Sequence, residues 1–381
     1  MNEKYLHFLW KMKRLPFPNL TLHNSKEFRI LDFGTYNEFE SGPDFQGAAI
    51  VYDDLNWFGS IELHVNASDW YKHKHQFDTA YDNVILHVVY NYDKDVSQNG
   101  RLLPTLELKN HIDQVHYSKF QYLETRPFDI PCQKSILGIP NTYLENMRDR
   151  AMENRLKRKC LELEKVEFLD ETHLLYILFA RSFGSHINQQ PFESLAISFD
   201  LQQFLTIPRG LRAKIMEQYA GFSSMEDLKF IDSKIYQWRL KGIRPHNTPK
   251  NQIQLFSDFI SEFDFSIPFW NFSTQDLIHH FHSHKVLLKK KSLLQNILIN
   301  AIPLFLYWKA KHENNSHFIS LAVELLKLLP TENNYITRKW LSVGIVSKNA
   351  FESQSNLEIY KQFCTRKRCL NCTIGIKILN Q

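Results

Sequence analysis

The stretch ESGPDFQGAAIVYDDLNWFGSIELHV, residues 40–65, decides the fold of the N-terminal region. Apolar and polar residues alternate on both sides of a polar break, which predicts two half-buried β-strands joined by a turn at residues 55–58. Glu62 and His64 are two residues apart on the second strand, so their side chains point to the same face. Asp44 precedes the first strand, and pairing of the two strands would bring it towards Glu62.

Two acids beside a histidine are typical of a divalent-metal site. Mg²⁺ and Mn²⁺ prefer oxygen ligands, and one or two carboxylates with water molecules complete such a site. The ion lowers the pKa of a bound water and stabilises the charge of a phosphate. Asp44 and Glu62 are therefore candidate ligands for Mg²⁺ or Mn²⁺, and His64 is a candidate for orienting or deprotonating the water. The alternative is a Gly-Pro-Asp turn followed by a solvated strand face.

The surrounding sequence predicts the rest of an α+β region. Residues 3–13 place apolar side chains on one face and predict a helix. Further strands are predicted at residues 28–33, 84–92 and 103–109, and residues 68–83 predict a short helical or irregular segment. The expected order is helix, three strands, helix, then one or two strands.

The domain boundaries follow from changes in composition. Residues 124–140 contain three prolines and predict a linker. Apolar residues then recur with the helical period, so we expect an α/β domain at 1–123, a helical domain at 141–350 and a cysteine-containing tail at 351–381. The hydrophobic content of 43% is enough for globular cores of this size.

The acidic pattern resembles the PD-(D/E)xK motif of restriction-endonuclease-like nucleases. Asp44 follows Pro43, and after a gap of 17 residues come Glu62, Leu63 and His64. The core of that family is a helix, three strands, a helix and a strand, which is similar to the order expected here. The resemblance implies a restriction-endonuclease-like N-terminal core.

The resemblance also implies roles for individual residues. Asp44 and Glu62 would hold the metal ion, and Glu38 or Glu40 would be the additional upstream acid. His64 stands where the family has lysine. A neutral imidazole accepts a proton but lacks the permanent charge and the reach of lysine. Both a working hydrolase and a degenerate, non-catalytic nuclease fold are consistent with this departure.

A second group of metal-binding side chains follows the first. It comprises Asp69, His73, His75, Asp78 and His87. These residues either extend the first site or bind phosphate when protonated. A further alternative is a small-molecule metalloenzyme that uses His64, His73 and His75. His87, within an apolar strand, is typical of a buried structural histidine.

The cysteines predict a second metal site. Cys364, Cys369 and Cys372 form C-x4-C-x2-C near the C-terminus, a spacing typical of metal knuckles. Cys132 is the preferred fourth ligand, with Cys160 or a histidine as the alternative. Four thiolates suit Zn²⁺ or a [4Fe–4S] cluster. The chain has an odd number of cysteines, 5, and no secretion signal is recognised, so a disulfide framework is not expected.

The charge and hydropathy bear on partners and location. The formal net charge of +5 is compatible with nucleic-acid binding. The basic residues expected to contact nucleic acid are Arg239, Arg244, Lys289, Lys290, Arg366 and Arg368. The most apolar window, residues 293–308, is too short and too polar to cross a bilayer. We expect a cytoplasmic protein with nucleic acid as partner and no membrane contact.

The whole chain also resembles a family of bacterial proteins described only as a domain of unknown function. The stretches that carry this resemblance are SGPDFQGAAI, GSIELHVNASDWYKHKH, YDNVILHVVY, IRPHNTP and FCTRKRCLNCTIG. They span nearly the full length and support the architecture rather than a chemistry. The sequence thus favours a metal-dependent nuclease-like enzyme acting on DNA or RNA. The alternative is a non-catalytic nucleic-acid-binding or scaffold protein with a structural metal site.

Overall fold

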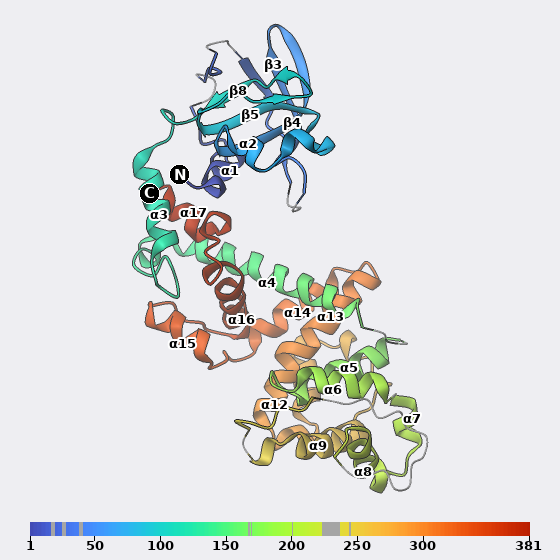
Figure 1. The fold of residues 1–381 in the computed structure, drawn as a ribbon. Coiled ribbons are helices and arrows are strands. Elements are labelled where there is room, and N and C mark those ends of the chain that lie inside the picture. The colour runs from blue at the N-terminus through green and yellow to red at the C-terminus, as the bar shows by residue number, and fades with distance from the viewer. Residues whose placement is uncertain are drawn as a thin grey trace. The chain divides into compact units, whose positions relative to one another are not determined.

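The computed structural model describes residues 1–16, 20–24, 28–37, 41–166, 168, 170–199, 201–222, 237–243 and 245–381. These residues form two compact units, Met1–Ile139 with Cys364–Gln381, and Pro140–Phe363. The first unit contains the sheet, and the second is built from helices (Figure 1). The α+β class expected from the sequence is confirmed.

Among the described residues, a six-stranded sheet has the order β1-β3-β4-β5-β8, with β2 paired to β3. The strands are β1 (Phe28–Asp32), β2 (Thr35–Tyr36), β3 (Phe45–Tyr52), β4 (Leu55–Asn66), β5 (Val84–Asn91) and β8 (Thr105–Glu107). β3 pairs antiparallel with β1, β2 and β4, whereas β5 pairs parallel with β4 and β8. Between β5 and β8 in the chain, β6 (Ser97–Gln98) and β7 (Arg101–Leu102) form a separate ribbon.

The β3–β4 hairpin turns at Asp53 and Asp54, which both have left-handed backbone conformations with φ of 51° and 58°. Aspartate tolerates this conformation, and two successive left-handed residues match the twist of a two-residue hairpin. The turn predicted at residues 55–58 is therefore wrong, because these residues begin β4 and pair with β3.

A crossover of short helical turns joins β4 to β5, as a parallel pair requires. It comprises α2 (Asp69–Lys72) and the 3₁₀ turns η1 (His75–Phe77) and η2 (Thr79–Tyr81). Trp70 of α2 is fully buried in a cluster with Tyr81 and residues of β5. The crossover thereby covers one face of β4 and β5 and brings its polar side chains to that face.

Gly59 of β4 lies where the end of the crossover passes closest to the strand. A Cβ atom on Gly59 would lie 2.1 Å from the carbonyl oxygen of Asn83 and 2.7 Å from Cγ2 of Ile85. The next N–H, of Ser60, donates to the same oxygen at 3.0 Å. Glycine therefore permits the close approach that starts the β4–β5 pairing.

Helix α1 (Glu3–Lys11) begins at Asn2, whose side chain accepts a hydrogen bond from the N–H of Lys4. Its buried side chains are Tyr5, Leu6, Phe8, Leu9 and Trp10. The helix packs on the sheet against β4, and Trp10 lies edge-on to Phe45 at the start of β3. Burial of this apolar face leaves His7 free to reach the end of β3.

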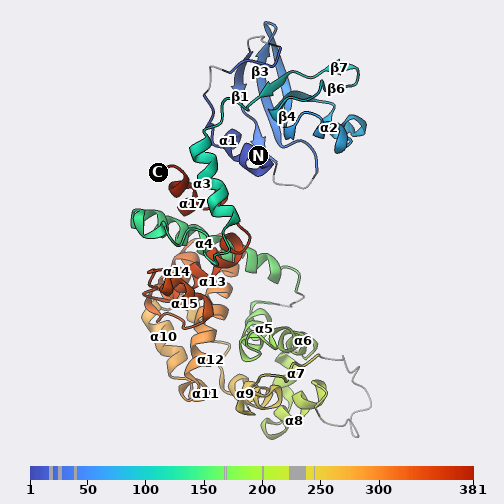
Figure 2. The same ribbon diagram turned by 60° about the vertical axis from the view of Figure 1, so that its left-hand side comes forward.

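The C-terminal segment packs with the first unit. α17 (Thr373–Leu379) lies beside α3 (Gln114–Thr125) in both ribbon views (Figures 1 and 2). Lys367 donates to the carbonyl oxygen of Arg126 at 2.6 Å. The division into units thus differs from the expected one, because the chain up to Ile139 belongs to the first unit and the helical unit extends to Phe363.

The second unit has one continuous hydrophobic core that most of its helices share. Its described α-helices are α4 (Asn141–Leu163), α5 (Glu171–Phe183), α6 (Gln189–Ser198), α7 (Leu201–Thr206), α8 (Arg209–Tyr219), α9 (Pro249–Glu262), α10 (Thr274–His282), α11 (Lys285–Leu288), α12 (Lys291–Asn296), α13 (Ile302–His312), α14 (His317–Leu328), α15 (Tyr335–Ser342) and α16 (Ala350–Ile359). A π-helical turn, Ile297–Ala301, joins α12 to α13, and a second, Tyr360–Cys364, follows α16.

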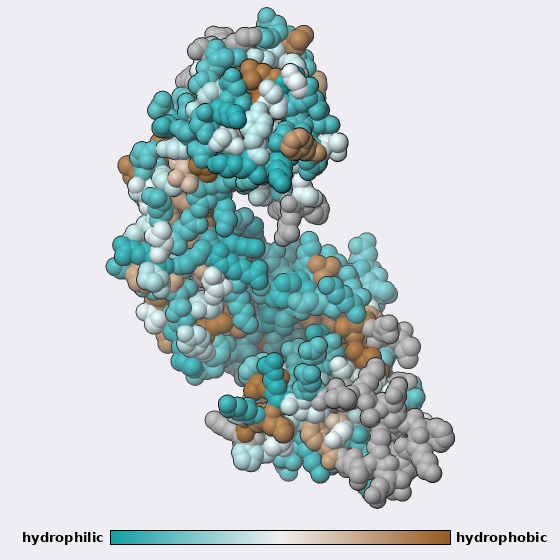
Figure 3. Space-filling view, in the orientation of Figure 1, coloured by the Kyte–Doolittle hydropathy of each residue, from teal (hydrophilic) through white to brown (hydrophobic). Residues whose placement is uncertain are grey.

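The hydropathy of the first unit's surface and the apolar character of the helices are separate features. On the face shown in Figure 3, hydrophilic side chains cover most of the first unit and hydrophobic ones are scattered. Within the described part of the chain, no helix combines the length and the apolar character needed to cross a bilayer.

Candidate metal site

Glu62, His64 and His87 share one face of the sheet. Glu62 and His64 alternate along β4, and Glu62 pairs in parallel register with His87 of β5. Their side chains are almost fully enclosed, with residue exposures of 5%, 1% and 0%. Buried polar groups require partners, so these three residues depend on each other and on the crossover above them.

Asp44 and Glu62 are joined through the backbone. The N–H of Asp44 donates to Oε2 of Glu62 at 3.0 Å, and the N–H of Leu63 donates to Oδ2 of Asp44 at 2.9 Å. The structure thus brings together the two acids that the hairpin pattern predicts. Each carboxylate uses one oxygen on a main-chain donor, which leaves Oε1 of Glu62 available for a different partner.

Ring nitrogens of His64, His73 and His75 all lie within 4.8 Å of one another. Nε2 of His64 is 3.1 Å from Nδ1 of His73. Oε1 of Glu62 faces the same set, 3.4 Å from Nε2 of His75 and 3.6 Å from Nε2 of His64. No other set of three or more such ligand atoms is equally compact among the described residues. Three imidazoles and a carboxylate form a donor set for a divalent transition metal.

The backbone between the two crossover histidines is unusual. Lys74 has a left-handed conformation with φ of 64°, and it separates His73, at the end of α2, from His75, at the start of η1. A non-glycine residue in this conformation costs about 1–3 kcal/mol, and such residues concentrate at ligand clamps. The sharp turn lets both imidazoles reach His64.

His87 supports His64 from beneath. Nδ1 of His64 lies 2.9 Å from Nε2 of His87. This contact occupies one ring nitrogen of His64 and leaves the other, Nε2, facing His73. Metal-binding histidines usually have their second nitrogen held in this way. Trp70 lies edge-on to both rings, 5.3 Å from His87 and 6.4 Å from His64 between ring centroids. Because Trp70 is fully buried, it packs against the site and cannot stack on a base.

Burial removes charge from the cluster. It raises the pKa of Glu62 to about 9, and the negative charge of Asp44 adds to the effect. It lowers the pKa of His64 to about 2, of His87 to about 3 and of His75 to about 4, with neighbouring histidines contributing. The imidazoles of His64, His75 and His87 are therefore neutral at neutral pH, and neutral imidazole is the form that binds a metal. A bound cation would favour the ionised form of Glu62.

His7 of α1 adds a residue that the sequence reasoning missed. Its Nε2 lies 3.0 Å from Oδ2 of Asp44 and 3.8 Å from Oε1 of Glu3. Nε2 is buried and forms no hydrogen bond within the described residues, although the side chain is 15% exposed. The spacing of Glu3 and His7, one helical turn apart, is the signal that marks a polar edge on this helix.

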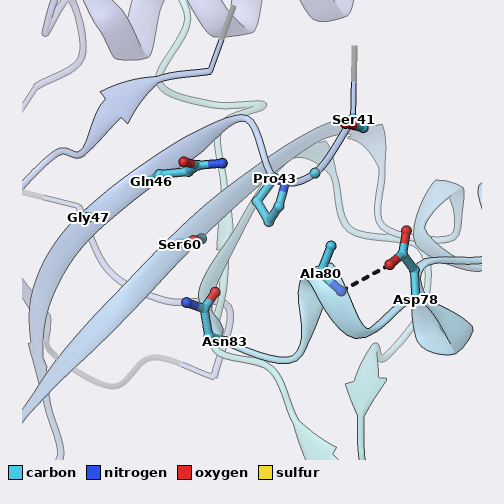
Figure 4. A pocket seen from close by; sticks show the side chains of 9 residues that line it. Ser41, Pro43, Gln46, Gly47, Ser60, Asp78, Ala80 and Asn83 are labelled. Carbon is cyan, nitrogen blue, oxygen red and sulfur yellow. Dashed lines mark hydrogen bonds between the residues drawn. The ribbon is translucent and has the colours of Figure 1, made fainter. Parts of the chain in front are cut away.

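A recess of about 500 Å³ opens beside Pro43, the residue before Asp44 in the chain (Figure 4). It is lined by Ser41, Gly42, Pro43, Gln46, Gly47, Ser60, Asp78, Ala80 and Asn83. The carboxylate of Asp78 accepts the N–H of Ala80 at 2.9 Å, which fixes one wall. No lysine or arginine is among these lining residues.

The other candidates from the sequence are not part of this cluster. Glu38, Glu40 and Arg244 lie outside the described residues. Arg239 is exposed, and its main-chain N–H donates to Oδ1 of Asn188 at 2.9 Å. Lys289, Arg366 and Arg368 are exposed and Lys290 is half-buried. Arg239, Lys289 and Lys290 belong to the helical unit, and Arg366 and Arg368 belong to the first unit.

Cys132, Cys364, Cys369 and Cys372 are buried in the first unit and are not joined by disulfides. Burial raises the pKa of Cys369 to about 12, and the neighbouring Cys372 adds to the effect. Burial also raises the pKa values of Cys132 and Cys364, again with contributions from the other thiols of the group. The two cysteine-bearing stretches therefore lie close together, whereas Cys160 belongs to α4 of the helical unit.

The fold and this site define a two-unit α+β protein with a buried histidine–carboxylate cluster on its sheet. Residues 3–212 match the family described as "Protein of unknown function (DUF2851)", and the chain belongs to that family. No curated protein and no solved structure matches the chain. The family match contains the whole histidine–carboxylate cluster and Cys132, and it ends before the other three cysteines of the group.

Proposed function

We propose that this protein is a divalent-metal-dependent hydrolase that cleaves phosphodiester bonds of DNA or RNA. The observation that carries the proposal is the convergence of Asp44 and Glu62 with three histidines at one end of the β3–β4 hairpin. The element order is a helix, four strands of which β2 has only two residues, a short helical crossover and a strand. This order supports a restriction-endonuclease-like core, which is part of the same proposal.

The donor set favours Mn²⁺ over Mg²⁺, because Mg²⁺ demands oxygen ligands and Mn²⁺ also accepts imidazole nitrogen. The proposed ligands are His64, His73, His75 and Oε1 of Glu62. A bound ion would supply a water of lowered pKa and positive charge against the phosphate. Asp44 would orient Glu62 through the backbone hydrogen bond that joins them.

In this proposal His64 is a ligand rather than a base. Both of its ring nitrogens face other histidines, and the residue is 1% exposed, so it does not reach a substrate. His7 is better placed to accept a proton from water, because it is more exposed and lies against Asp44. Asp44 would hold the imidazole of His7 in place and stabilise it when protonated.

One observation favours the alternative, a non-catalytic nucleic-acid-binding or scaffold protein on a degenerate nuclease fold. Asp44 and Glu62 each accept a main-chain hydrogen bond, which is the role of acids that fix a turn. In that case the cluster would hold the crossover to the sheet without turning over a substrate.

The two functions are separated by cleavage assays on single- and double-stranded DNA and RNA with Mn²⁺ or Mg²⁺. We expect the wild type to cut with Mn²⁺, and Glu62→Gln and His73→Ala to lose at least about tenfold activity. Asp54→Asn, in the exposed β3–β4 turn, is the matched control and should cut normally. Binding without cleavage would support the non-catalytic alternative. Equal cleavage by all variants would exclude this cluster as the active site.

We also propose that the four clustered cysteines hold a structural metal. Thiolates around one zinc ion are about 3.8 Å apart, given a Zn–S bond of about 2.3 Å. The four sulfur atoms are not that compact, since no cysteine set meets the 4.8 Å spacing among the described residues. A [4Fe–4S] cluster, in which each thiolate binds a different iron, suits the wider spacing better than Zn²⁺. Iron analysis and the visible absorption spectrum of the purified protein test this assignment.

A further inference from the structure

The helical unit contains a large cavity apart from the sites described above. It measures about 1020 Å³, and all of its lining residues belong to Pro140–Phe363. Small-molecule pockets are usually about 300–1,000 Å³, so this cavity is large enough for a ligand of drug or nucleotide size. α4, α5 and the segment 290–304 supply its polar wall.

The cavity is strongly basic. Its cationic lining residues are Arg155, Arg158, Lys159, Arg181, Lys290 and Lys361. The carboxylates in the lining are Glu162 and Glu332. The lining thus carries more cations than carboxylates, which favours an anionic ligand.

Two of these cations are neutralised by local ion pairs. Arg158 binds Glu358 through Nε and a terminal nitrogen at 3.2 and 3.0 Å, and it also contacts Glu162 at 2.8 Å. Arg181 pairs with Glu193 at 2.6 Å. These ion pairs stabilise the wall of the cavity. They also neutralise Arg158 and Arg181, so these two residues offer a ligand little positive charge.

Arg155 and Lys159 have no such partner. Their nearest acceptor is Oδ1 of Asn300, at 2.8 Å from Arg155 and 3.5 Å from Lys159, and neither forms an ion pair with any described carboxylate. Arg155 is only 6% exposed. Burial lowers the pKa of Lys159 well below its ordinary value, and the charges of Arg155 and Arg181 add to the effect. The carboxylates of Glu358 and Glu332 act on Arg155 only from beyond ion-pair distance, and Lys159 is half-buried. A cation that is withdrawn from water and contacts no carboxylate is costly, and an anionic ligand would offset that cost.

The acceptor that these two cations share is itself held in place. Nδ2 of Asn300 donates to Oδ1 of Asn296 at 2.9 Å, and Asn296 donates to the carbonyl oxygen of Ser182 at 2.8 Å. This chain of donors fixes the amide of Asn300 with its oxygen towards the cations. Asn300 lies in the π-helical turn Ile297–Ala301, and such turns occur frequently at functional sites.

We propose that this cavity binds a small molecule carrying a phosphate group, with Arg155 and Lys159 as the groups that recognise the phosphate. The remaining walls include apolar side chains, among them Leu178, Phe183, Phe192, Leu304 and Tyr335. A molecule with a phosphate at one end and a flat or apolar group at the other, as in a nucleotide, matches a cavity with a cationic wall and further walls that include apolar side chains. A duplex backbone contacts exposed cations, whereas Arg155 lies on an enclosed wall. The site is independent of the proposed hydrolase chemistry, because it lies in the other unit.

The test uses the full chain and titration calorimetry in a phosphate-free buffer with a chelator, with ADP, inorganic pyrophosphate and a short single-stranded DNA as probes. We expect ADP to bind and Lys159→Gln to weaken its affinity at least about tenfold. Lys157→Gln, exposed on the same helix and outside the cavity lining, is the matched control and should bind like the wild type.

Thermal unfolding with and without ADP shows whether a variant loses affinity for the ligand or only loses stability. Without ligand, Lys159→Gln should be at least as resistant to thermal unfolding as the wild type, because it removes a half-buried cation that contacts no described carboxylate. ADP should raise the midpoint of the wild type and of Lys157→Gln but not of Lys159→Gln. The proposal is overturned if neither ADP nor pyrophosphate binds at millimolar concentration, or if both variants bind ADP equally well. It is also overturned if only the DNA binds.

Discussion

Oε2 of Glu62 accepts a hydrogen bond from the main-chain N–H of Asp44 at 3.0 Å, which couples the entrance of β3 to the middle of β4. The same geometry turns Oε1 of Glu62 towards His75 and His64. One carboxylate thus serves the backbone with one oxygen and the histidine cluster with the other. These two roles can be separated by substitution.

Replacing Glu62 by glutamine should remove the metal site and spare the fold. The amide keeps a carbonyl oxygen for the N–H of Asp44, so the free energy of unfolding with a chelator should stay within about 1 kcal/mol of the wild type. Mn²⁺ should stabilise the wild type but not Glu62→Gln. Glu62→Ala also loses the acceptor, and an additional loss of about 1–3 kcal/mol is expected without metal. Denaturant unfolding with and without Mn²⁺ measures both effects. Equal stabilisation of wild type and Glu62→Gln by Mn²⁺ would exclude Glu62 as a ligand.

The cysteine group offers a comparison within one residue type. Cys132→Ser, Cys364→Ser, Cys369→Ser and Cys372→Ser should each reduce the iron or zinc content, because each removes one of the proposed ligands. Cys160→Ser is the control, since this buried thiol lies in the other unit. Elemental analysis after purification under reducing conditions gives the metal content. Undiminished metal in Cys132→Ser would assign the fourth ligand elsewhere.

The approach of the crossover to β4 sets a third expectation. Gly59→Ala places a methyl group 2.1 Å from the carbonyl oxygen of Asn83, and the backbone must move to relieve the clash. Overpacking of this kind costs about 1–3 kcal/mol. Gly138→Ala is the matched control, because nothing lies within 4 Å of its added Cβ. Chemical unfolding curves of the two variants should therefore separate clearly, and coinciding curves would show that β4 and β5 tolerate a wider separation.

The sequence predicts the local parts of this site well. Alternation along β4 places Glu62 and His64 on one face, and that pattern is independent of the rest of the chain. The hairpin turn was misplaced because Asp53 and Asp54 adopt left-handed conformations that aspartate allows but that lack the usual Asn-Gly or Asp-Gly signature. The alternation of apolar and polar residues predicts which face of the sheet each side chain occupies, even when the turn is predicted at the wrong position.

The long-range parts of the site could not be predicted in this way. His73 and His75 are visible as a pair in the sequence, but their meeting with His64 depends on how the crossover folds over β4 and on the left-handed Lys74. His7 reaches Asp44 only because α1 packs on the sheet. The basic cavity likewise requires α4 and Asn300 to be packed together, which spacing along the chain does not encode.

Lys159 leads to a prediction of pH dependence for the unliganded protein. Its pKa is lowered in the folded state, chiefly by burial, below the ordinary value of 10.5. Between the folded and the ordinary pKa the unfolded chain binds more protons at this residue than the native chain does. The contribution of Lys159 to stability therefore rises with pH in that window and is lost as pH falls. The free energy of unfolding of the wild type should therefore increase relative to that of Lys159→Gln as pH rises towards 10.5, by at most about 1.4 kcal/mol per pH unit.

Urea unfolding of both proteins in phosphate-free buffers at several pH values measures this difference. Lys157→Gln is the control and should track the wild type, because Lys157 is exposed. A pH-independent difference between wild type and Lys159→Gln would mean that Lys159 keeps its ordinary protonation in the cavity.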